Sequence, residues 1–305
     1  MFLVPTSWEL TSLVCKLFLY FGTASIAGGS FCLWQYNDGR RQSFEKIIVY
    51  IILGTFLGLL GTAVNYFVQV GLINAGGLTG MFDWDMASLL LETQLGDVTS
   101  LRLTGFILAL ASGLLFFRKT VRLIQPPQQS AYRILLIANS IAFLLIAFSF
   151  TKGGHISILS EIARIAIVLH LFAFSTWIGS LFPLLLLTNS TQMGLLQRLM
   201  RQFGDQALKI VVVLAGAGML MLLELLDSPV ELYTTPYGLA LSMKLLLVLV
   251  TLGAAATNKL VLVPAILNEA NPSRLRRSIR IEILAATLVL IVTAYLSTIV
   301  GPADH

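Results

Sequence analysis

The sequence is poor in charged residues, in histidine and in cysteine. Asp, Glu, Lys and Arg together make up 11% of its 305 residues, and there are three histidines and two cysteines. So little charge excludes an ordinary soluble domain, in which about a quarter of the residues are charged. No glycine-rich nucleotide-binding motif is present either, which argues against an ATP-driven pump. Cys15 and Cys32 lie 17 residues apart in one apolar run, and a helix would separate them by about 25 Å, too far for an intramolecular disulfide.

Apolar residues take the place of charge, and they predict an all-α integral membrane protein. The hydrophobic set makes up 57% of the chain, and its long runs have the length that a helix needs to cross a bilayer. We expect eight spans, at about 9–34, 47–73, 101–117, 134–151, 160–187, 210–226, 238–262 and 281–300. Because eight is even, both termini should lie on the same side of the membrane. The start MFLVPTSWEL has no basic region, so we expect the first span to be retained rather than cleaved.

Basic residues fall in alternate connections. The connections after spans one, three, five and seven hold 15 of the 20 basic residues, whereas the longest of the others carries acidic residues such as Asp85 and Glu92. By the positive-inside rule, both termini and this acidic connection are outside. The net charge of +5 therefore reflects topology, and it is no argument for a nucleic-acid partner.

The acidic connection should contain a short interfacial helix. The segment DWDMASLLLETQL carries Trp84, Leu89, Leu90 and Leu91 among acidic residues, a pattern typical of a helix lying at the membrane surface. Asp83, Asp85, Met81 and Met86 could gather a cation there, but a solvated face of the loop is the favoured interpretation.

An internal repeat divides the chain. Thr, Gly, a basic residue and Leu recur with the same spacing 142 residues apart, first at Thr93, Gly96, Arg102 and Leu103 and then at Thr235, Gly238, Lys244 and Leu245. A weaker match sets Lys16-Leu17-Phe18 beside His170-Leu171-Phe172, and chance could produce it. These echoes predict two four-helix halves, 1–151 and 152–305, related by an axis along the membrane normal.

His170 lies inside the fifth span and needs an explanation. A polar ring at that depth should face other helices, water or an ion. We consider a structural imidazole bonded to a neighbouring helix and a ligand role equally plausible from the span alone. Trp177 follows two turns later on the same face, and Gly179 and Ser180 would allow another helix to approach closely.

Other polar or soft side chains also occur within or beside the spans. Methionine thioethers suit Cu(I), although methionine is more often core filler, and the buried charges could equally form structural ion pairs. Glu224 could neutralise Lys16, Arg102 or Lys244, and Glu282 could pair with Arg276 or Arg280. The remaining candidates are His155, Arg164, Met219, Met221, Met243 and Asn258.

Several stretches resemble the CopD family of bacterial inner-membrane copper-resistance and copper-uptake proteins. They are HLFAFSTWIGSLFPLLL at 170–186, TTPYGLALSMKLLLVLVTLGAAATNKL at 234–260, RLRRSIRIEILAATLVLIVTAYLST at 274–298 and, less closely, LLETQLGDVTSLRL at 90–103. The resemblance implies eight helices, copper as the ion handled, and supply from a periplasmic CopC-type copper carrier. His170 matches the membrane histidine of the family, and His155 resembles its upstream Gly-His element.

These observations favour copper transport or handling across the inner membrane, by a protein that is not an enzyme. In that reading His170, His155, Met219, Met221 and Met243 are the candidate copper contacts. The alternative is a divergent protein that binds an anionic solute or a lipid through its outer basic residues, or that serves as an assembly factor. A b-type cytochrome is disfavoured, because His155 and His170 are 15 residues apart, up to about 22 Å along a helix, whereas two axial ligands need similar depth.

Overall fold

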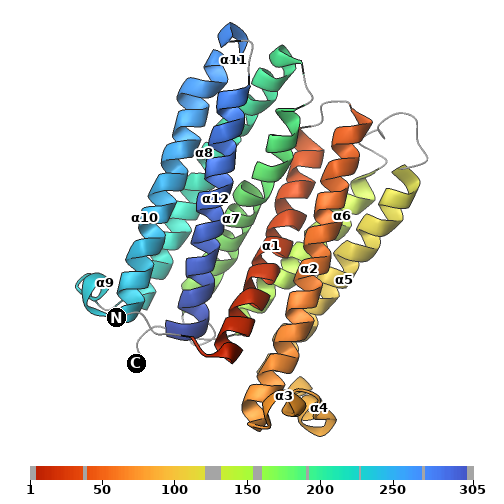
Figure 1. The fold of residues 1–305 in the computed structure, drawn as a ribbon, viewed down its shortest axis with the longest axis vertical. Coiled ribbons are helices and arrows are strands. Elements are labelled where there is room, and N and C mark those ends of the chain that lie inside the picture. The colour runs from red at the N-terminus through yellow and green to blue at the C-terminus, as the bar shows by residue number, and fades with distance from the viewer. Residues whose placement is uncertain are drawn as a thin grey trace.

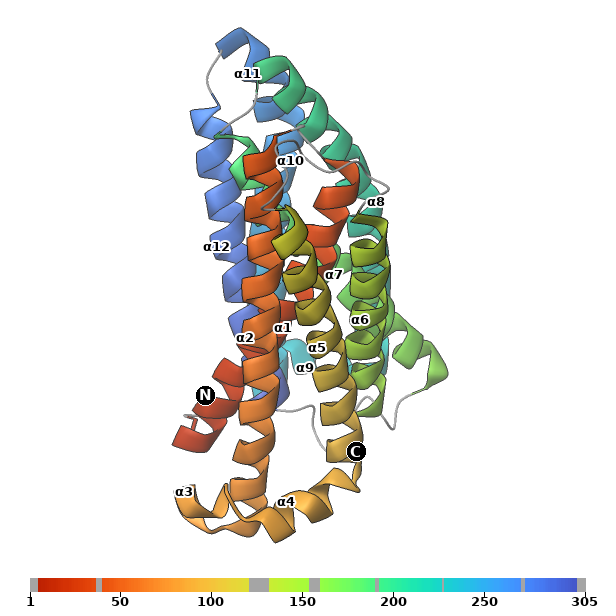
Figure 2. The same ribbon diagram turned by 90° about the vertical axis from the view of Figure 1, so that its right-hand side faces the viewer.

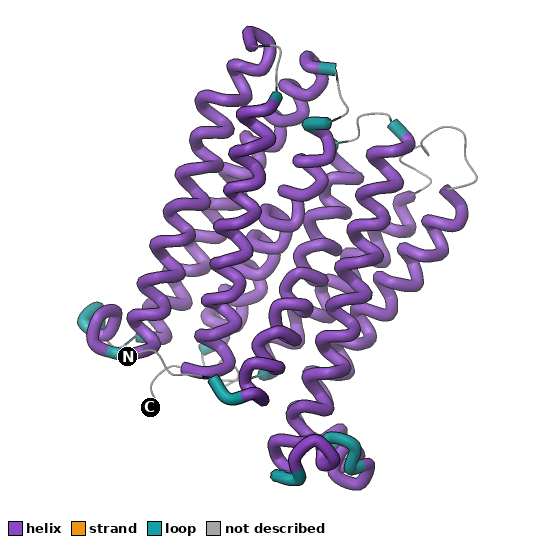
Figure 3. Tube along the Cα trace, in the orientation of Figure 1, coloured by secondary structure: helices purple, strands orange, loops and turns teal. Residues whose placement is uncertain are grey.

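A computed structural model describes residues 5–36, 40–120, 132–153, 160–189, 192–226, 228–269 and 272–300. Every regular element in these ranges is a helix (Figure 3). Eight helices or continuous helical segments are long and apolar enough to cross a membrane, and the protein is an all-α integral membrane protein, as the sequence predicts. They are α1 (Ser7–Gln35), α2 (Arg41–Asn74), α5 (Gln94–Thr120), α6 (Arg133–Lys152), α7 (Glu161–Leu187), α8 (Met193–Leu225), α10 (Pro236–Thr257) with its continuations η3 (Asn258–Leu262) and α11 (Val263–Glu269), and α12 (Ser273–Tyr295) with η4 (Leu296–Val300).

The largest difference from the expected boundaries is at α8, which begins at Met193 rather than near 210. Its first part is amphipathic, with Leu196, Leu199, Met200 and Phe203 buried in the largest apolar cluster. That spacing of three and four residues places them on one helical face. A hydropathy average over this part is lowered by the arginines on the other faces, so a search for uniformly apolar runs finds only the second part of the helix.

The acidic connection forms two short helices at the end of the bundle where α1 begins and η4 ends (Figures 1 and 2). These are α3 (Gly77–Gly80) and α4 (Trp84–Leu91), and α4 confirms the expected short helix. Asp83 caps α4: its carboxylate accepts from the Met86 N–H at 3.0 Å and from Asn74 Nδ2 at 2.8 Å. Both bonds lower the pKa of Asp83, and the bond from Met86 has the larger effect. Asp83 is therefore a capping residue, and the solvated interpretation of this loop fits the structure better than a cation site.

Helices α1 and α7 cross at the centre of the bundle through small residues. A Cβ atom added to Gly179 would lie 1.8 Å from the Ala24 carbonyl oxygen, and one added to Gly28 would lie 2.1 Å from the Gly179 carbonyl carbon. Tyr50 of α2 also donates to the Gly179 carbonyl at 3.1 Å. Only glycine permits so close an approach of two backbones, which is why this crossing can hold the two groups of helices together.

The two groups of four helices lie side by side (Figure 1). Helix α1 contacts α7 and α12, while α7 contacts α1 and α6, so exchanging the halves exchanges these contacts. Helices α5 and α10 begin 142 residues apart, and α1 and α7 begin 154 residues apart. These are the offsets of the two sequence matches described above, that of the Thr-Gly-base-Leu pattern and that of Lys16-Leu17-Phe18 with His170-Leu171-Phe172. The exchange of contacts is incomplete, because α2 packs on α5 whereas α8 makes no comparable contact with α10 in the described ranges. The duplication therefore stays a prediction, and superposition of the halves is its test.

The turns of the repeat are similar in the two halves but not identical, because Thr93 bonds three residues back and Thr235 bonds four residues back. Thr93 Oγ1 donates to the Leu90 carbonyl, and Thr235 Oγ1 donates to the Glu231 carbonyl. The following short turn packs so closely that a Cβ on Gly96 would lie 2.0 Å from the carbonyl oxygen of Leu91. At Gly238 the corresponding atom would lie 1.8 Å from the Glu231 carbonyl oxygen. The repeated Thr and Gly thus fix how a short outer helix, α4 or α9 (Glu231–Thr234), leads into a span.

Candidate functional site

His170 lies on α7 where this helix packs against α8. A Cβ added to Gly218 of α8 would be 3.3 Å from the imidazole Cε1 and 3.4 Å from Nδ1, so the absence of a side chain at Gly218 makes room for the ring. The Nδ1 atom is buried and has no hydrogen-bond partner in the described ranges. Lys244 of α10 is close enough to act on His170 electrostatically. His170 therefore faces the interior of the second half, beside a positive charge.

The methionines do not join His170 in the way the sequence led us to expect. Met219 and Met243 are 56% and 49% exposed, so these side chains are largely turned toward the outer surface of the bundle. The expected ligand set fails here because neighbours in sequence on a helix point in different directions: Gly218 faces His170, and Met219, one residue on, is rotated by about 100°. Met221 is half-buried.

Two basic residues, Lys16 and Arg102, lie close together in the first half, as His170 and Lys244 do in the second. Lys16 Nζ donates to the Ser297 carbonyl at 2.6 Å, and Arg102 Nε donates to Ser149 Oγ at 2.9 Å. The Arg102 guanidinium also lies 4.8 Å from the centroid of the Phe150 ring. The charges of Lys16 and Arg102 are near enough to repel each other. No carboxylate forms an ion pair with either residue within the described ranges.

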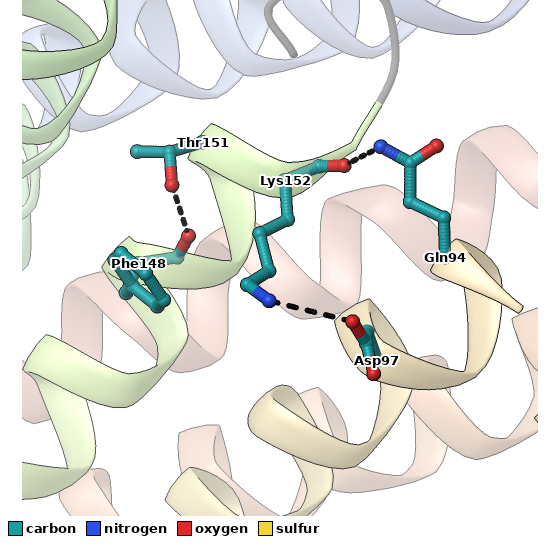
Figure 4. Close-up of polar contacts among 5 residues, drawn as sticks. All are labelled: Gln94, Asp97, Phe148, Thr151 and Lys152. Atoms are coloured by element: carbon teal, nitrogen blue, oxygen red, sulfur yellow. Dashed lines mark hydrogen bonds and ion pairs between the residues drawn. The ribbon is translucent and has the colours of Figure 1, made fainter. Parts of the chain in front are cut away.

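The acidic residues expected to neutralise these bases have other partners. Asp97 lies 3.3 Å from Lys152 Nζ, and Gln94 of the same helix donates to the Lys152 carbonyl (Figure 4). Glu224 accepts from Ser160 Oγ at 2.6 Å at the beginning of α7. The expectation that Glu224 neutralises Lys16, Arg102 or Lys244 is therefore wrong. The carboxylates instead link neighbouring helices at the outer rim, where they are partly solvated.

Arg164 lies near the outer end of α7. Its Nε atom is buried and has no hydrogen-bond partner among the described residues. With Lys16, Arg102 and Lys244 it makes four basic side chains within ten residues of the starts of α7, α1, α5 and α10. The residues around Lys16 and Arg102, namely Tyr20, Ser149 and Ser297, could not be found from the sequence, because hydroxyl side chains are frequent in these spans and carry no spacing signal.

Glu282, Trp177 and Asn258 meet in the inner part of the second half. Asn258 Nδ2 donates to Glu282 Oε2 at 2.9 Å. The Trp177 indole is close enough to act on this carboxyl, although its Nε1–H makes no hydrogen bond of good geometry. Glu282 does not pair with Arg276 as expected, because Arg276 donates to the carbonyl and the hydroxyl of Thr188. The cluster is called the inner polar cluster below.

A local widening of the seventh span positions Asn258. Residues Asn258–Leu262 form a π-helical turn in which the Val263 N–H bonds to the Asn258 carbonyl. Pro264 follows directly and has no N–H to continue the α-helical ladder. Such turns are uncommon and often occur at functional sites. The sequence identified Asn258 as a polar group, but the widening that brings it to α12 has no simple sequence signature.

An apolar groove lies elsewhere in the structure. It has a volume of about 870 Å³ and opens between α1, α2, α7 and α12, with apolar residues such as Phe21, Leu53 and Ile283 along it and Arg41 and Lys46 at its inner end. Neither His170 nor Glu282 lines it. We therefore place the candidate site at the buried polar residues and not at this groove.

The described ranges contain no group of three or more His, Cys, Asp or Glu that could hold a metal. His155 lies outside the described residues. Both cysteines are free and buried, as their spacing predicted. Among the described residues of the second half, the imidazole offered to a metal ion is that of His170, with a buried Nδ1 atom. One such ligand suits brief contact with a passing ion better than tight storage.

Residues 197–296 match the family described as Copper resistance protein D, CopD. This segment of the chain is similar to the CopD family. No curated protein and no solved structure matched it in two further comparisons. The matched residues cover about a third of the chain and include all of α10 and α12 and most of α8.

The CopD match contains part of the candidate site. Lys244, Asn258 and Glu282 lie within the matched residues, whereas His170 and Trp177, on α7, precede them. The structure nevertheless brings the two sets together, because Lys244 acts on His170 and Glu282 lies beside Trp177. Helix α7 and the segment similar to CopD thus contribute side chains to both groups of polar residues.

Proposed function

We propose that this protein moves copper across the bacterial inner membrane, between periplasm and cytoplasm. The observation that carries the proposal is the family match over helices whose polar residues face α7. His170 and Lys244 occupy the outer part of this half, and Trp177, Asn258 and Glu282 lie further in. Intramembrane ionisable residues are costly and mark ion pathways more often than they serve packing alone.

His170 has the chemistry for one step of such a path. Its neutral imidazole carries a nitrogen lone pair, which is a borderline-soft ligand for copper. A lone ligand beside the Lys244 charge would hold the ion weakly, and an ion that must be released needs weak sites. Copper is then cargo rather than a resident cofactor, and the protein is a transporter and not an enzyme.

The proposed topology places this step toward the periplasm. With the basic connections inside, both termini, α4 and the outer basic residues are periplasmic. A periplasmic CopC-type copper carrier would deliver the ion at this face, and membrane lipids would cover the outward-facing residues. These assignments rest on charge distribution and on the family.

The proposal is tested by copper content in cells that lack or express the gene, and by copper uptake into proteoliposomes. We expect His170→Ala to abolish copper-dependent uptake while the purified protein keeps its elution profile and melting behaviour. His305→Ala, which removes an imidazole at the last residue of the chain, is the matched control and should retain uptake. Normal uptake by a stable His170→Ala variant in which His155 is also replaced would refute the histidine-based mechanism.

A second candidate function is supported by the Lys16–Arg102 pair. Two adjacent cations without a carboxylate partner in the described ranges favour an anionic ligand, either a lipid phosphate group or a solute. Binding of inorganic phosphate and of phosphatidylglycerol can be compared by native mass spectrometry. Lys16→Gln with Arg102→Gln should reduce binding, whereas Lys259→Gln, which removes a base paired with Asp205 at 3.0 Å, should not.

A further inference from the structure

The inner polar cluster contains a carboxyl group that is almost completely shielded. Glu282 is 2% exposed and Trp177 is also 2% exposed. Glu282 is nine residues beyond the start of α12 at Ser273, about 13 Å along the helix, so it lies well inside the bundle. A polar group at this depth must be satisfied by its neighbours.

The neighbours of Glu282 do not balance a negative charge. Its hydrogen bond is donated by an uncharged amide, and no basic side chain forms an ion pair with it within the described ranges. The nearest base along η3, Lys259, donates to the Gly204 carbonyl and pairs with Asp205. Removing an ionised carboxylate from water without a cation costs several kcal/mol or more.

Asn258 lacks a hydrogen-bond donor for its side-chain oxygen. While its Nδ2 donates to Glu282, its Oδ1 atom is buried and has no partner among the described residues. A buried acceptor without a donor costs about 1–3 kcal/mol. One added hydrogen would remove both deficiencies, because a protonated carboxyl is neutral and gains an O–H donor.

The atoms around Glu282 suit a proton better than a metal ion. A metal cation needs several oxygen, nitrogen or sulfur lone pairs directed at one point, and the described residues contain no such group. Here the Asn258 Nδ2–H points at the carboxyl, with the Trp177 indole beside it. N–H donors repel a cation but tolerate a carboxyl that gains and loses a proton.

Other titratable groups on the surrounding helices are engaged elsewhere. On α1, Cys32 donates to the Ser180 carbonyl at 3.9 Å and Tyr36 donates to Gln206 at 2.9 Å. On α12 itself, Arg276 is bound to Thr188. Lys259 of η3 and Asp205 of α8 form their own pair. Glu282 is therefore the carboxyl of this region that is available to exchange a proton.

We propose that Glu282, with Asn258 as its hydrogen-bond partner, is a proton-binding site. The carboxylate takes a proton from water that reaches the cluster and returns it to water, with no other bond formed or broken. In the protonated state the new O–H donates to the Asn258 oxygen. Resting on the proposed copper transport, this site supplies the ion that is exchanged for copper.

Difference infrared spectroscopy of the protein in lipid nanodiscs tests the site without copper. The C=O stretch of a protonated carboxyl shifts in D₂O, and in the wild type we expect one such band to titrate between about pH 5 and about pH 9, where buried carboxyls are known to titrate. Glu282→Gln should remove it, and Asn258→Leu should shift it. Glu224→Gln, which removes an exposed carboxyl bonded to Ser160, is the control and should leave it unchanged. An unchanged titrating band in Glu282→Gln overturns the inference.

Proteoliposomes loaded with a pH-sensitive dye test the exchange. Copper uptake by the wild type should be accompanied by proton movement, and Glu282→Gln should lose that movement while retaining copper–copper exchange. Equal proton movement in a folded Glu282→Gln variant would overturn the inference. Failure of the wild type to move copper would instead count against the proposed function, and the infrared band would still decide whether Glu282 binds a proton.

Discussion

The crossing of α1 and α7 gives the sharpest prediction about stability. Gly179→Ala adds one methyl group, which would lie 1.8 Å from the Ala24 carbonyl oxygen and 3.1 Å from the Gly28 Cα. Both are backbone atoms, so no side chain can rotate away. The two helices must separate by about 1.5 Å before that contact approaches ordinary van der Waals distance.

Overpacking of this kind costs about 1–3 kcal/mol, which corresponds to about a 5- to 150-fold fall in the ratio of folded to unfolded protein. Reversible unfolding in mixed detergent micelles, followed by tryptophan fluorescence, measures it, and Trp177 on α7 is a suitable reporter because it is buried. We expect the midpoint to fall, with the two halves losing their contact first.

Gly216→Ala is the matched control. Gly216 lies on α8, and a Cβ added there meets no atom within 4 Å. The same chemical change should therefore be neutral or stabilise the protein by up to about 1 kcal/mol, through helix propensity. Equal stability of Gly179→Ala and Gly216→Ala would refute the argument that direct backbone contact at Gly179 holds the halves together.

Three further predictions test the topology, the cap and the duplication. A reporter fused after His305 should give a periplasmic signal, and a cytoplasmic signal would reverse the assigned orientation. Asp83→Ala should speed amide hydrogen exchange at Met86, and Asp85→Ala, which changes an exposed carboxylate, is the control. Because the pKa of Asp83 is lowered, the cap stabilises α4 fully above the ordinary carboxyl pKa. This stabilisation is lost as the pH falls through the lowered pKa. In an experimental structure, superposing the first four spans on the last four should place Arg102 on Lys244, and unrelated depths would show that the repeat is coincidence.

The sequence predicted the fold well because bilayer thickness and backbone hydrogen bonding constrain a membrane protein so strongly. Eight spans could be found from apolar length alone. The prediction was poorest at α8, where the first part of the helix is amphipathic and packs in the largest apolar cluster through residues such as Leu196 and Leu199. A helix that is apolar on one face extends a span without extending its hydropathy signal.

The candidate site was only partly predictable. His170, Trp177, Asn258 and Glu282 stand out in the sequence because they are polar within apolar runs. Their partners do not, since a partner depends on helix rotation and on local changes such as the π-helical turn at Asn258–Leu262. This explains why Met219 was expected beside His170 and faces outward, and why Glu282 was expected beside an arginine and bonds to an amide.

The predicted duplication allows the side chains at equivalent positions of the two halves to be compared. Lys16 is nine residues beyond the start of α1, and His170 is nine residues beyond the start of α7. Each lies beside a base eight residues into its own half's third span, Arg102 in one case and Lys244 in the other. A charged ammonium or guanidinium has no free lone pair, so the Lys16–Arg102 pair cannot bind a metal ion. An imidazole can. At this depth in the described structure, the proposed contact with copper is therefore expected in the second half, which is also the half that contains the CopD match, and the first half is left with chemistry suited to anions.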